Sequence, residues 1–423
     1  MKKTALCLAL LGLLALGGQA VAVICTIDAV PAATLLLPYF EVDLNNPNGL
    51  TTLFSVNNAS ATAVLAHVTV YSDLSVPVLD FNIYLTGYDV QTINLRDILV
   101  NGNLPQTASA GQDPTDKISP KGPKSQDINF ASCTGQLPPP PLPPSFLQHL
   151  ALALTGKGSP LFGGLCAGRN LGDNIARGYI TVDTVNNCTL RLPSDINYFT
   201  SDITFQNVLW GDYFYVNQAQ NFANGDTLVH VEASLTNPAT TTAGRYTFYG
   251  RYVGWNAIDH REPLATTFAG RYANGGTFSG GTSYVVWRDS KTNQNPFTCP
   301  ATTGRPSWFP LGQEGIDIFD ETEQVNTPQT FPFSPQPPQQ GIIPFPAEAQ
   351  RTVINGADFP VPFNFGWLYL DLNTTISGNP NPPFDPAAAQ AWVTVNMDSN
   401  GHFSVGFSAI QLDSACAPNH FVP

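Results

Sequence analysis

Proline and glycine divide this 423-residue chain into short segments, and this division limits its possible folds more than any other feature. The chain has 37 Pro and 35 Gly, and Pro disrupts the interior of both helices and sheets. Between these breaks lie short runs rich in Val, Thr, Tyr and Phe, residues that favour strands. We therefore expect an all-β protein whose helices are few and short.

Strand periodicity is clearest near the N-terminus. In residues 63–73 (AVLAHVTVYSD), apolar side chains at 66, 68 and 70 alternate with His67, Thr69 and Tyr71, so the two sets lie on opposite faces of a strand. TTLFSV, LDFNIYL and YDVQTINL add three similar runs, separated by the turn-prone NNASAT and TGYD. Together these runs predict a β-sandwich.

The strand pattern stops between about residues 101 and 176. This segment contains a polar loop, then LPPPPLPP at 137–144, which predicts a polyproline II rod. SFLQHLALALTG follows and predicts one short helix, with Ser145 and Gln148 in capping-box spacing and Gly156 as its stop. We interpret the segment as an insertion lying on the sandwich, with the rod as a spacer rather than a docking site.

Strand patterns return after the insertion. They include ARGYITVDTVNNCTL and, later, TLVHVEASL, RYTFYGRYVGW, TSYVVWRD, GWLYLDLN, AWVTVNM and HFSVGFSAIQL. DSNG joins the last two as a hairpin turn with Gly401 at positive φ. FPFSPQPPQQGIIPFP, at 331–346, cannot lie inside a sheet. We expect one sandwich at 23–195, with the insertion, and a second β-rich sandwich region at 196–423.

Residues 1–22 have the features of an export signal. Lys2 and Lys3 precede the apolar run ALCLALLGLLALGG, and AVA at 20–22 provides the small residues of a cleavage site. Without the two lysines, 16 basic residues (18 minus 2) face 31 acidic ones, a formal charge of −15. This charge repels nucleic acid and anionic lipid, so we exclude both as partners. No later apolar run is long enough to span a membrane.

The cysteines also indicate export. Six follow the signal: Cys25, Cys133, Cys166, Cys188, Cys299 and Cys416. An even number in an exported chain favours three disulfides, although spacing alone does not choose the pairs. We predict that Cys133 pairs with Cys166 and clamps the base of the insertion, that Cys25 pairs with Cys416, and that Cys188 pairs with Cys299.

No motif indicates catalysis, a metal or a cofactor. The chain lacks GxSxG, and its cysteines form no CxxC pair. NMDSNG resembles the start of a calcium loop, but Phe407 occupies the position of the bidentate Glu. We therefore predict no catalytic residues, no metal and no cofactor.

One row of charges stands out, Asp259 to Glu262, in a chain where only 12% of residues are charged. If this row is extended, Asp259 and Arg261 point to one side and His260 and Glu262 to the other. With nearby aromatics, the candidate ligand-binding residues are Asp259, His260, Arg261, Glu262, Tyr249, Tyr252 and Trp255. We favour a structural ion network that ties strands together. The alternative is a glycan-binding face across 245–290, or a carbohydrate-active enzyme with a carboxylate pair.

Three stretches resemble a known group of proteins. ATLLLPYFEVDL, GLTTLFSVNNASATAVLAHVTVYSD and ARGYITVDTVNNC are similar to segments of secreted, largely uncharacterised bacterial proteins that open with an LLLPYF-type strand. The resemblance covers about residues 32–100 and 176–190, and it implies an immunoglobulin-like sandwich but no activity. The predicted fold class is all-β, with immunoglobulin-like or jelly-roll sandwiches and a Pro-rich insertion carrying one short helix.

These features together predict an exported protein located outside the cell, on its surface or in the periplasm. We expect a non-catalytic structural or adhesion role. The expected partners are a surface polysaccharide or another cell-surface protein.

Overall fold

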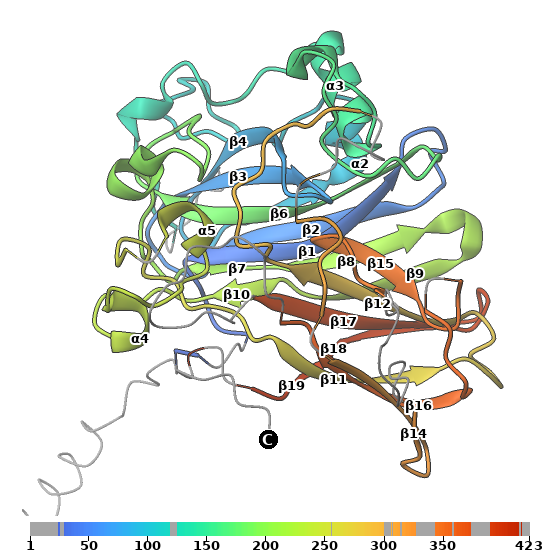
Figure 1. Ribbon diagram of the computed structural model, residues 1–423. Helices are drawn as coiled ribbons and strands as arrows, with labels where there is room; N and C mark the ends of the chain where they lie inside the picture. The colour runs from blue at the N-terminus through green and yellow to red at the C-terminus, as the bar shows by residue number, and fades with distance from the viewer. Residues whose placement is uncertain are drawn as a thin grey trace, which may run out of the picture.

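The structure is a computed structural model that describes residues 24–25, 29–118, 125–254, 256–299, 306, 308–313, 315–326, 343–357, 359–373, 390–413 and 416. These residues form four antiparallel sheets with a few short helices (Figure 1). The predicted all-β sandwich fold is therefore confirmed. The export signal and most of the 331–346 stretch lie outside the described residues.

The first sandwich consists of two sheets. Sheet 1 has the order β10-β1-β6-β3-β4, with β1 at Thr34–Asp43, β3 at Val64–Ser72, β4 at Pro77–Leu85, β6 at Ile175–Val185 and β10 at Val229–Val231. Sheet 2 has the order β5-β2-β8-β9, and β7 also pairs with β2. Its strands are β2 (Thr51–Asn58), β5 (Val90–Asn94), β7 (Leu209–Trp210), β8 (Asp212–Asn217) and β9 (Phe222–Thr227).

Strands β7 to β10 follow residue 195 in the chain, yet they pair with β1 and β2 and with one another. The first sandwich therefore extends to Val231, which differs from the predicted boundary between 195 and 196. The difference has a simple reason, because alternation shows that a segment is a strand but not which distant strand it joins.

The second sandwich also consists of two sheets. Sheet 3 has the order β15-β12-β17-β18 and sheet 4 the order β14-β13-β16-β11-β19. The strands are β11 (Thr267–Ala273), β12 (Gly281–Arg288), β13 (Gly315–Asp320), β14 (Val325–Asn326), β15 (Ala349–Val353), β16 (Phe365–Asp371), β17 (Ala391–Asp398), β18 (Ser404–Ser408) and β19 (Ile410–Gln411). β17 and β18 form the predicted hairpin, with Gly401 at φ 79°.

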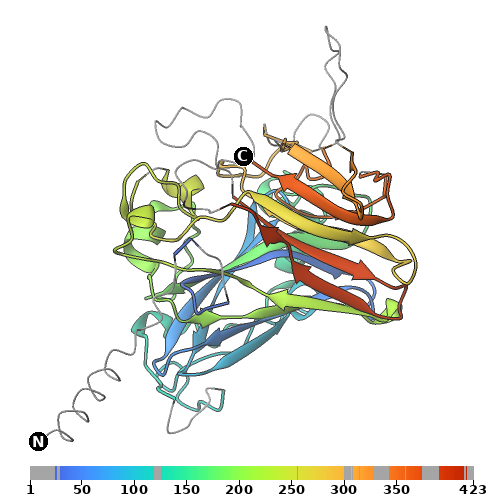
Figure 2. The ribbon, with the colours of Figure 1, turned by 90° about the horizontal axis from the view of Figure 1, so that it is seen from below.

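Sheet 3 is shared by the two sandwiches. On β12, Val285 and Trp287 belong to the core of the first sandwich, whereas Tyr284 and Val286 belong to the core of the second. Figures 1 and 2 show the orange and red strands of the second half against the blue and green strands of the first. Sheet 3 therefore lies between two hydrophobic cores and contributes side chains to both.

The LLLPYF stretch forms β1 and contains a β-bulge. The register with β6 shifts between Leu37 and Phe40, around Pro38, which has no N–H to donate to the ladder. Opposite the bulge, a Cβ added to Gly178 would lie 1.8 Å from the carbonyl oxygen of Tyr71. Glycine at this position therefore lets the sheet 1 strands approach closely.

The insertion carries the predicted helix, α3 (Pro144–Leu154). Its start differs from the expectation, because Pro143 is the N-cap and no side chain caps the helix. Pro143 has no side chain that could accept a hydrogen bond as a cap, and Pro144 at the first helical position lacks the N–H that would be unsatisfied there. The other α-helices are α2 (Leu95–Leu99), α4 (Pro238–Thr241) and α5 (Gly250–Val253).

The proline segment at 137–144 lies against the body of the protein. The N–H of Leu142 donates to the carbonyl of Gly102 over 2.8 Å, and the Gln106 amide donates to the Pro139 carbonyl over 2.9 Å. Its polar atoms therefore contact a neighbouring segment of the same chain.

All six cysteines form disulfides, and one of the three predicted pairs is correct. Cys25 pairs with Cys416 as expected. The predicted clamp from Cys133 to Cys166 is wrong, as is the pairing of Cys188 with Cys299. The observed bonds join Cys133 to Cys188 and Cys166 to Cys299.

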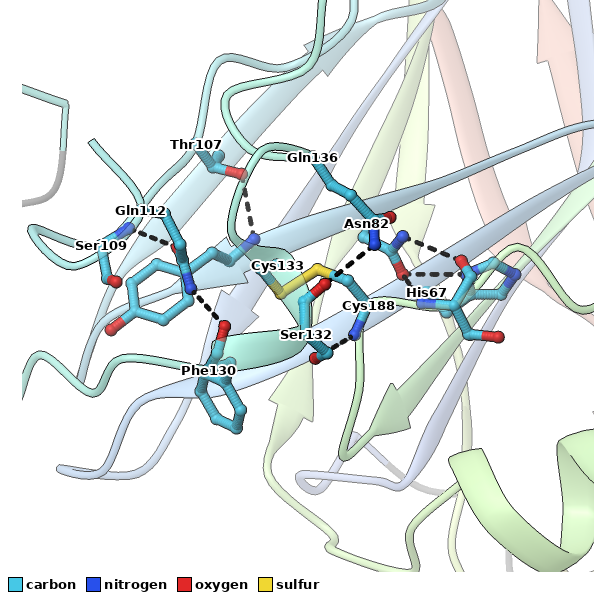
Figure 3. The surroundings of a disulfide bond; sticks show 12 residues. His67, Asn82, Thr107, Ser109, Gln112, Phe130, Ser132, Cys133, Gln136 and Cys188 are labelled. Atoms are coloured by element: carbon cyan, nitrogen blue, oxygen red, sulfur yellow. Dashed lines mark hydrogen bonds between the residues drawn. A yellow bond between two sulfur atoms is a disulfide. The ribbon is translucent and has the colours of Figure 1, made fainter.

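The surroundings of Cys133 explain its partner (Figure 3). The Cys188 N–H donates to the hydroxyl of Ser132 over 3.0 Å, and Asn82 of β4 donates to the carbonyl of Thr189 over 2.9 Å. The chain leaving β6 is thereby held beside Cys133. Cys166 lies at the other side of the insertion, in a backbone bridge with Phe297. The two bonds fix the insertion to separate parts of the protein instead of closing it on itself.

Candidate functional site

A row of polar residues crosses one face of sheet 1. The strand register places Thr34 of β1 opposite Asp183 of β6, which lies opposite His67 of β3, which in turn lies opposite Asn82 of β4. All four side chains are buried. Along β6, the side chains of Tyr179, Thr181 and Asp183 point to this face. Asp183 therefore places a charge in the interior, and a buried charge requires a partner.

Arg261 supplies this partner. Its Nη1 lies 3.2 Å from Asp259 Oδ1, and its Nε lies 3.6 Å from Asp183 Oδ1 and donates to the hydroxyl of Thr34. Its Nη2 donates to the carbonyl of Thr204 over 3.0 Å. Arg261, Asp259 and Asp183 are all 0% exposed. The guanidinium therefore joins sheet 1 to the loop segment that covers it.

Two tyrosines complete the Asp183 environment. The hydroxyls of Tyr198 and Tyr249 donate to Asp183 Oδ2 over 2.7 and 2.6 Å. The Tyr249 ring also lies under the guanidinium of Arg261, 5.7 Å from its centroid. Burial, and then the charge of Asp183, raise the pKa of both tyrosines, so they stay neutral donors.

Burial raises the pKa of Asp259, and the charge of Arg261 opposes this increase. The Asp259 carboxylate also accepts the Tyr249 N–H over 2.9 Å. We call the group Thr34, Asp183, Tyr198, Tyr249, Asp259 and Arg261 the Arg261 network. The hydrogen bonds of this network join sheet 1 to the segments that cover it, or lie within those segments.

The other members of the charged row, His260 and Glu262, have different partners. Glu262 accepts the N–H of Glu232 over 2.9 Å and that of Cys25 over 2.6 Å, and it is 0% exposed. His260 is half-buried, with Nδ1 3.3 Å from the carbonyl of Thr240. Neither residue joins the Arg261 network.

The remaining candidates do not form a binding face either. Tyr252 is half-buried and its ring lies 6.0 Å from that of Tyr249. Trp255 lies outside the described residues. The structure brings Tyr249, Asp259 and Arg261 together but in the interior, where no glycan reaches them.

A second buried network joins the two sandwiches. Arg251 of α5 lies 2.5 Å from Asp289 and 2.8 Å from Glu348, two carboxylates of the second half. Glu348 also accepts the hydroxyl of Ser75, which in turn is 2.7 Å from the hydroxyl of Tyr179 on β6. Arg251, Asp289 and Glu348 are each at most 4% exposed at their side chains. This Arg251 network shares one cation between two acids.

Burial raises the pKa of Glu348 to about 7, with a further contribution from Asp289, whereas Arg251 lowers it. The native protein therefore binds this proton more tightly than the unfolded chain does. The resulting stability is fully present below the ordinary glutamate pKa and is lost as the pH rises toward 7.

We predict that ionisation of Glu348 lowers the free energy of unfolding as the pH rises from 5 to 8. A pKa shift of this size implies a loss of about 2 to 3 kcal/mol. The measurement is the free energy of unfolding in urea at both pH values, for the wild type and Glu348→Gln with disulfides intact. The difference in the free energy of unfolding between the two proteins removes the contribution of the other titratable groups, which both proteins share. A difference that is equal at pH 5 and pH 8 contradicts the prediction.

Arg288 is a third buried arginine, with a different set of partners. It is 0% exposed and donates to the backbone carbonyls of Leu311, Phe345, Gly312 and Leu372. Burial lowers its pKa to about 9. This side chain fixes three separate loops of the second half, a role that no sequence pattern revealed.

A groove of about 1100 Å³ is the feature that sequence reasoning missed. It lies in the second sandwich between β11 and β18, and Arg271, Trp367, Val405 and Phe407 are among its lining residues. The exposed apolar residues at this end are Phe403, Val405, Ile410 and Leu412. Their run of strand alternation was the only signal, and it does not distinguish an open edge from a buried one.

The described residues contain no group of three or more His, Cys, Asp or Glu side chains that is arranged to hold a metal ion. Among those same residues, no helix is long and apolar enough to cross a membrane. Comparison with protein-family models, with curated proteins and with solved structures gave no match. The function is therefore inferred from the geometry of this chain.

Proposed function

We propose that this protein is an exported, non-catalytic structural or adhesion protein of the cell surface. The proposal rests on the placement of the charged residues that the sequence singled out. Asp259, Arg261 and Glu262 are fully buried and bonded within the protein. Charged groups bonded in this way connect parts of a scaffold, and the loss of one partner leaves the other charge buried without compensation. They are not available to a substrate, which a catalytic acid or base must reach.

The location outside the cytoplasm is part of the same proposal. Three disulfides connect distant parts of the chain, and such bonds persist in oxidising compartments. The features of residues 1–22 and the resemblance to secreted bacterial proteins agree with this location. A rigid, cross-linked, acidic body of this kind suits attachment to a surface polysaccharide or to another cell-surface protein.

The alternative is a glycan-binding protein or a carbohydrate-active enzyme that uses region 245–290. A glycosidase needs two carboxylates that flank the sugar bond. Asp259 and Glu262 are both 0% exposed, so the geometry gives this alternative less support.

A deletion strain and a polysaccharide panel together test the proposal. We expect the deletion strain to lose surface attachment and to recover it when the gene is restored. We also expect the purified protein to release no sugar product from any polysaccharide in the panel. Normal attachment by the deletion strain, or product release, overturns the proposed function.

A further inference from the structure

The groove between β11 and β18 has mainly apolar walls. Phe365, Trp367, Met397, Val405 and Phe407 contribute to them. The Val405 side chain is 42% exposed. An exposed apolar groove of this size on the surface of an acidic protein is typical of a binding site.

A peptide strand does not suit this groove, because the backbone of β11 is already satisfied there. The hydroxyl of Tyr284 donates to the carbonyl of Arg271 over 3.1 Å. The hydroxyl of Thr282 bonds both the N–H and the carbonyl of Ala273, each over 2.8 Å. Strand addition requires free backbone groups along an edge. Side chains of β12 occupy these groups instead.

A glycan does not suit the groove either. Two of its hydroxyl groups are already used, since Tyr272 donates to the carbonyl of Phe319 over 2.9 Å and Ser408 donates to Asp226 over 2.7 Å. Arg271, Glu321 and the indole N–H of Trp367 are the remaining polar groups of the lining. A sugar buried against these walls would leave many of its hydroxyls without partners, which is costly.

Arg271 gives the groove a cationic end. Its guanidinium lies over the Phe407 ring, 5.7 Å from the centroid, and it forms no ion pair with any described residue. The side chain is exposed. An exposed, unneutralised guanidinium is a strong donor to a carboxylate. Glu321 lies in the turn after β13, also exposed.

We propose that this groove binds an amphiphilic anion, a fatty-acid-type carboxylate whose aliphatic chain lies between β11 and β18 and whose head group contacts Arg271. Apolar walls match the chain, and the guanidinium matches the single charge. This ligand site is independent of the proposed function, because a structural or adhesion protein fulfils that role whether or not this groove is occupied.

The test is isothermal titration calorimetry of the purified, disulfide-bonded protein with decanoate and with decylamine, below their aggregation concentrations. The two probes share an apolar tail and differ in charge. We expect decanoate to bind about tenfold or more tightly than decylamine, as charge-assisted hydrogen bonding implies.

Variants locate the site. Arg271→Gln is expected to weaken decanoate binding about tenfold or more, whereas Arg271→Lys keeps the charge and most of the affinity. Val405→Glu places an anion in the groove and is expected to abolish decanoate binding. Val90→Glu is the matched control, because Val90 is a 60% exposed strand valine in the first sandwich. It is expected to bind like the wild type.

Both valines are exposed, so each variant is expected to fold, and thermal unfolding monitored by circular dichroism verifies this. Equal binding of decanoate and decylamine overturns the assignment of an anionic ligand. Undiminished decanoate binding by Val405→Glu and Arg271→Gln overturns the location. If the wild-type protein does not bind decanoate at all, the proposed ligand site is overturned. That outcome does not affect the test of the proposed function, which measures surface attachment by the deletion strain.

Discussion

Replacement of Arg261 by methionine is expected to lower the free energy of unfolding by about 3 to 5 kcal/mol, which is the usual cost of leaving buried charges without their partner. Asp183 and Asp259 are both 0% exposed, and both depend on the Arg261 guanidinium for charge compensation. Tyr198 and Tyr249 continue to donate to Asp183 in the variant. Their neutral hydroxyls do not cancel its charge.

Urea denaturation at pH 7 with intact disulfides measures this effect. Arg245→Met is the matched control, since Arg245 is half-buried and forms no ion pair with any described residue. Asp259→Asn removes one carboxylate but keeps the shape, so we expect a smaller loss from it than from Arg261→Met. Equal stability of the Arg261→Met and Arg245→Met proteins is incompatible with a structural role for the Arg261 network.

Removal of the Cys133–Cys188 bond is expected to lower the free energy of unfolding by about 2 to 5 kcal/mol, as for other native disulfides. The bond joins residues 55 positions apart, and it connects the insertion to the chain leaving β6. Cys133 is 0% exposed, so its loss also affects packing. The appropriate variant is Cys133→Ala/Cys188→Ala, measured by urea denaturation.

A second double variant checks the pairing itself. Cys133→Ala/Cys166→Ala breaks two bonds of the observed pattern, so it is expected to destabilise the protein more than Cys133→Ala/Cys188→Ala and to leave two free thiols. If Cys133 paired with Cys166, both results would reverse. Thiol titration of the two unfolded variants, together with peptide mapping without reduction, decides between the patterns.

Local patterns in the sequence predicted most of the strands, because strand periodicity is a local property. The prediction was wrong for RYTFYGRYVGW, whose described residues form a loop and helix α5 instead of a strand. The alternation of residues 63–73 predicted β3, and DSNG predicted the turn between β17 and β18. The helix of the insertion was also predicted, although Pro144 shifted its first residue. Each of these features depends on side chains within a few positions of one another.

The sequence also predicted that Asp259 and Arg261 point the same way, and their side chains form an ion pair over 3.2 Å. The sequence did not predict which residues these side chains contact. The partner of Arg261 on sheet 1 is Asp183, which is remote in the sequence. The same limit applies to Cys133, whose partner was misassigned. Contacts between distant segments depend on sheet order and loop packing, which leave no local signal.

The sequence by itself thus determined the all-β class, the position of the insertion and the common direction of the Asp259 and Arg261 side chains. Only the tertiary structure decided that the first sandwich extends to Val231, that Asp259, Arg261 and Glu262 are buried, and that an apolar groove opens beside Arg271. The physical reason is that periodicity fixes the direction of a side chain, whereas burial depends on which distant segment covers it.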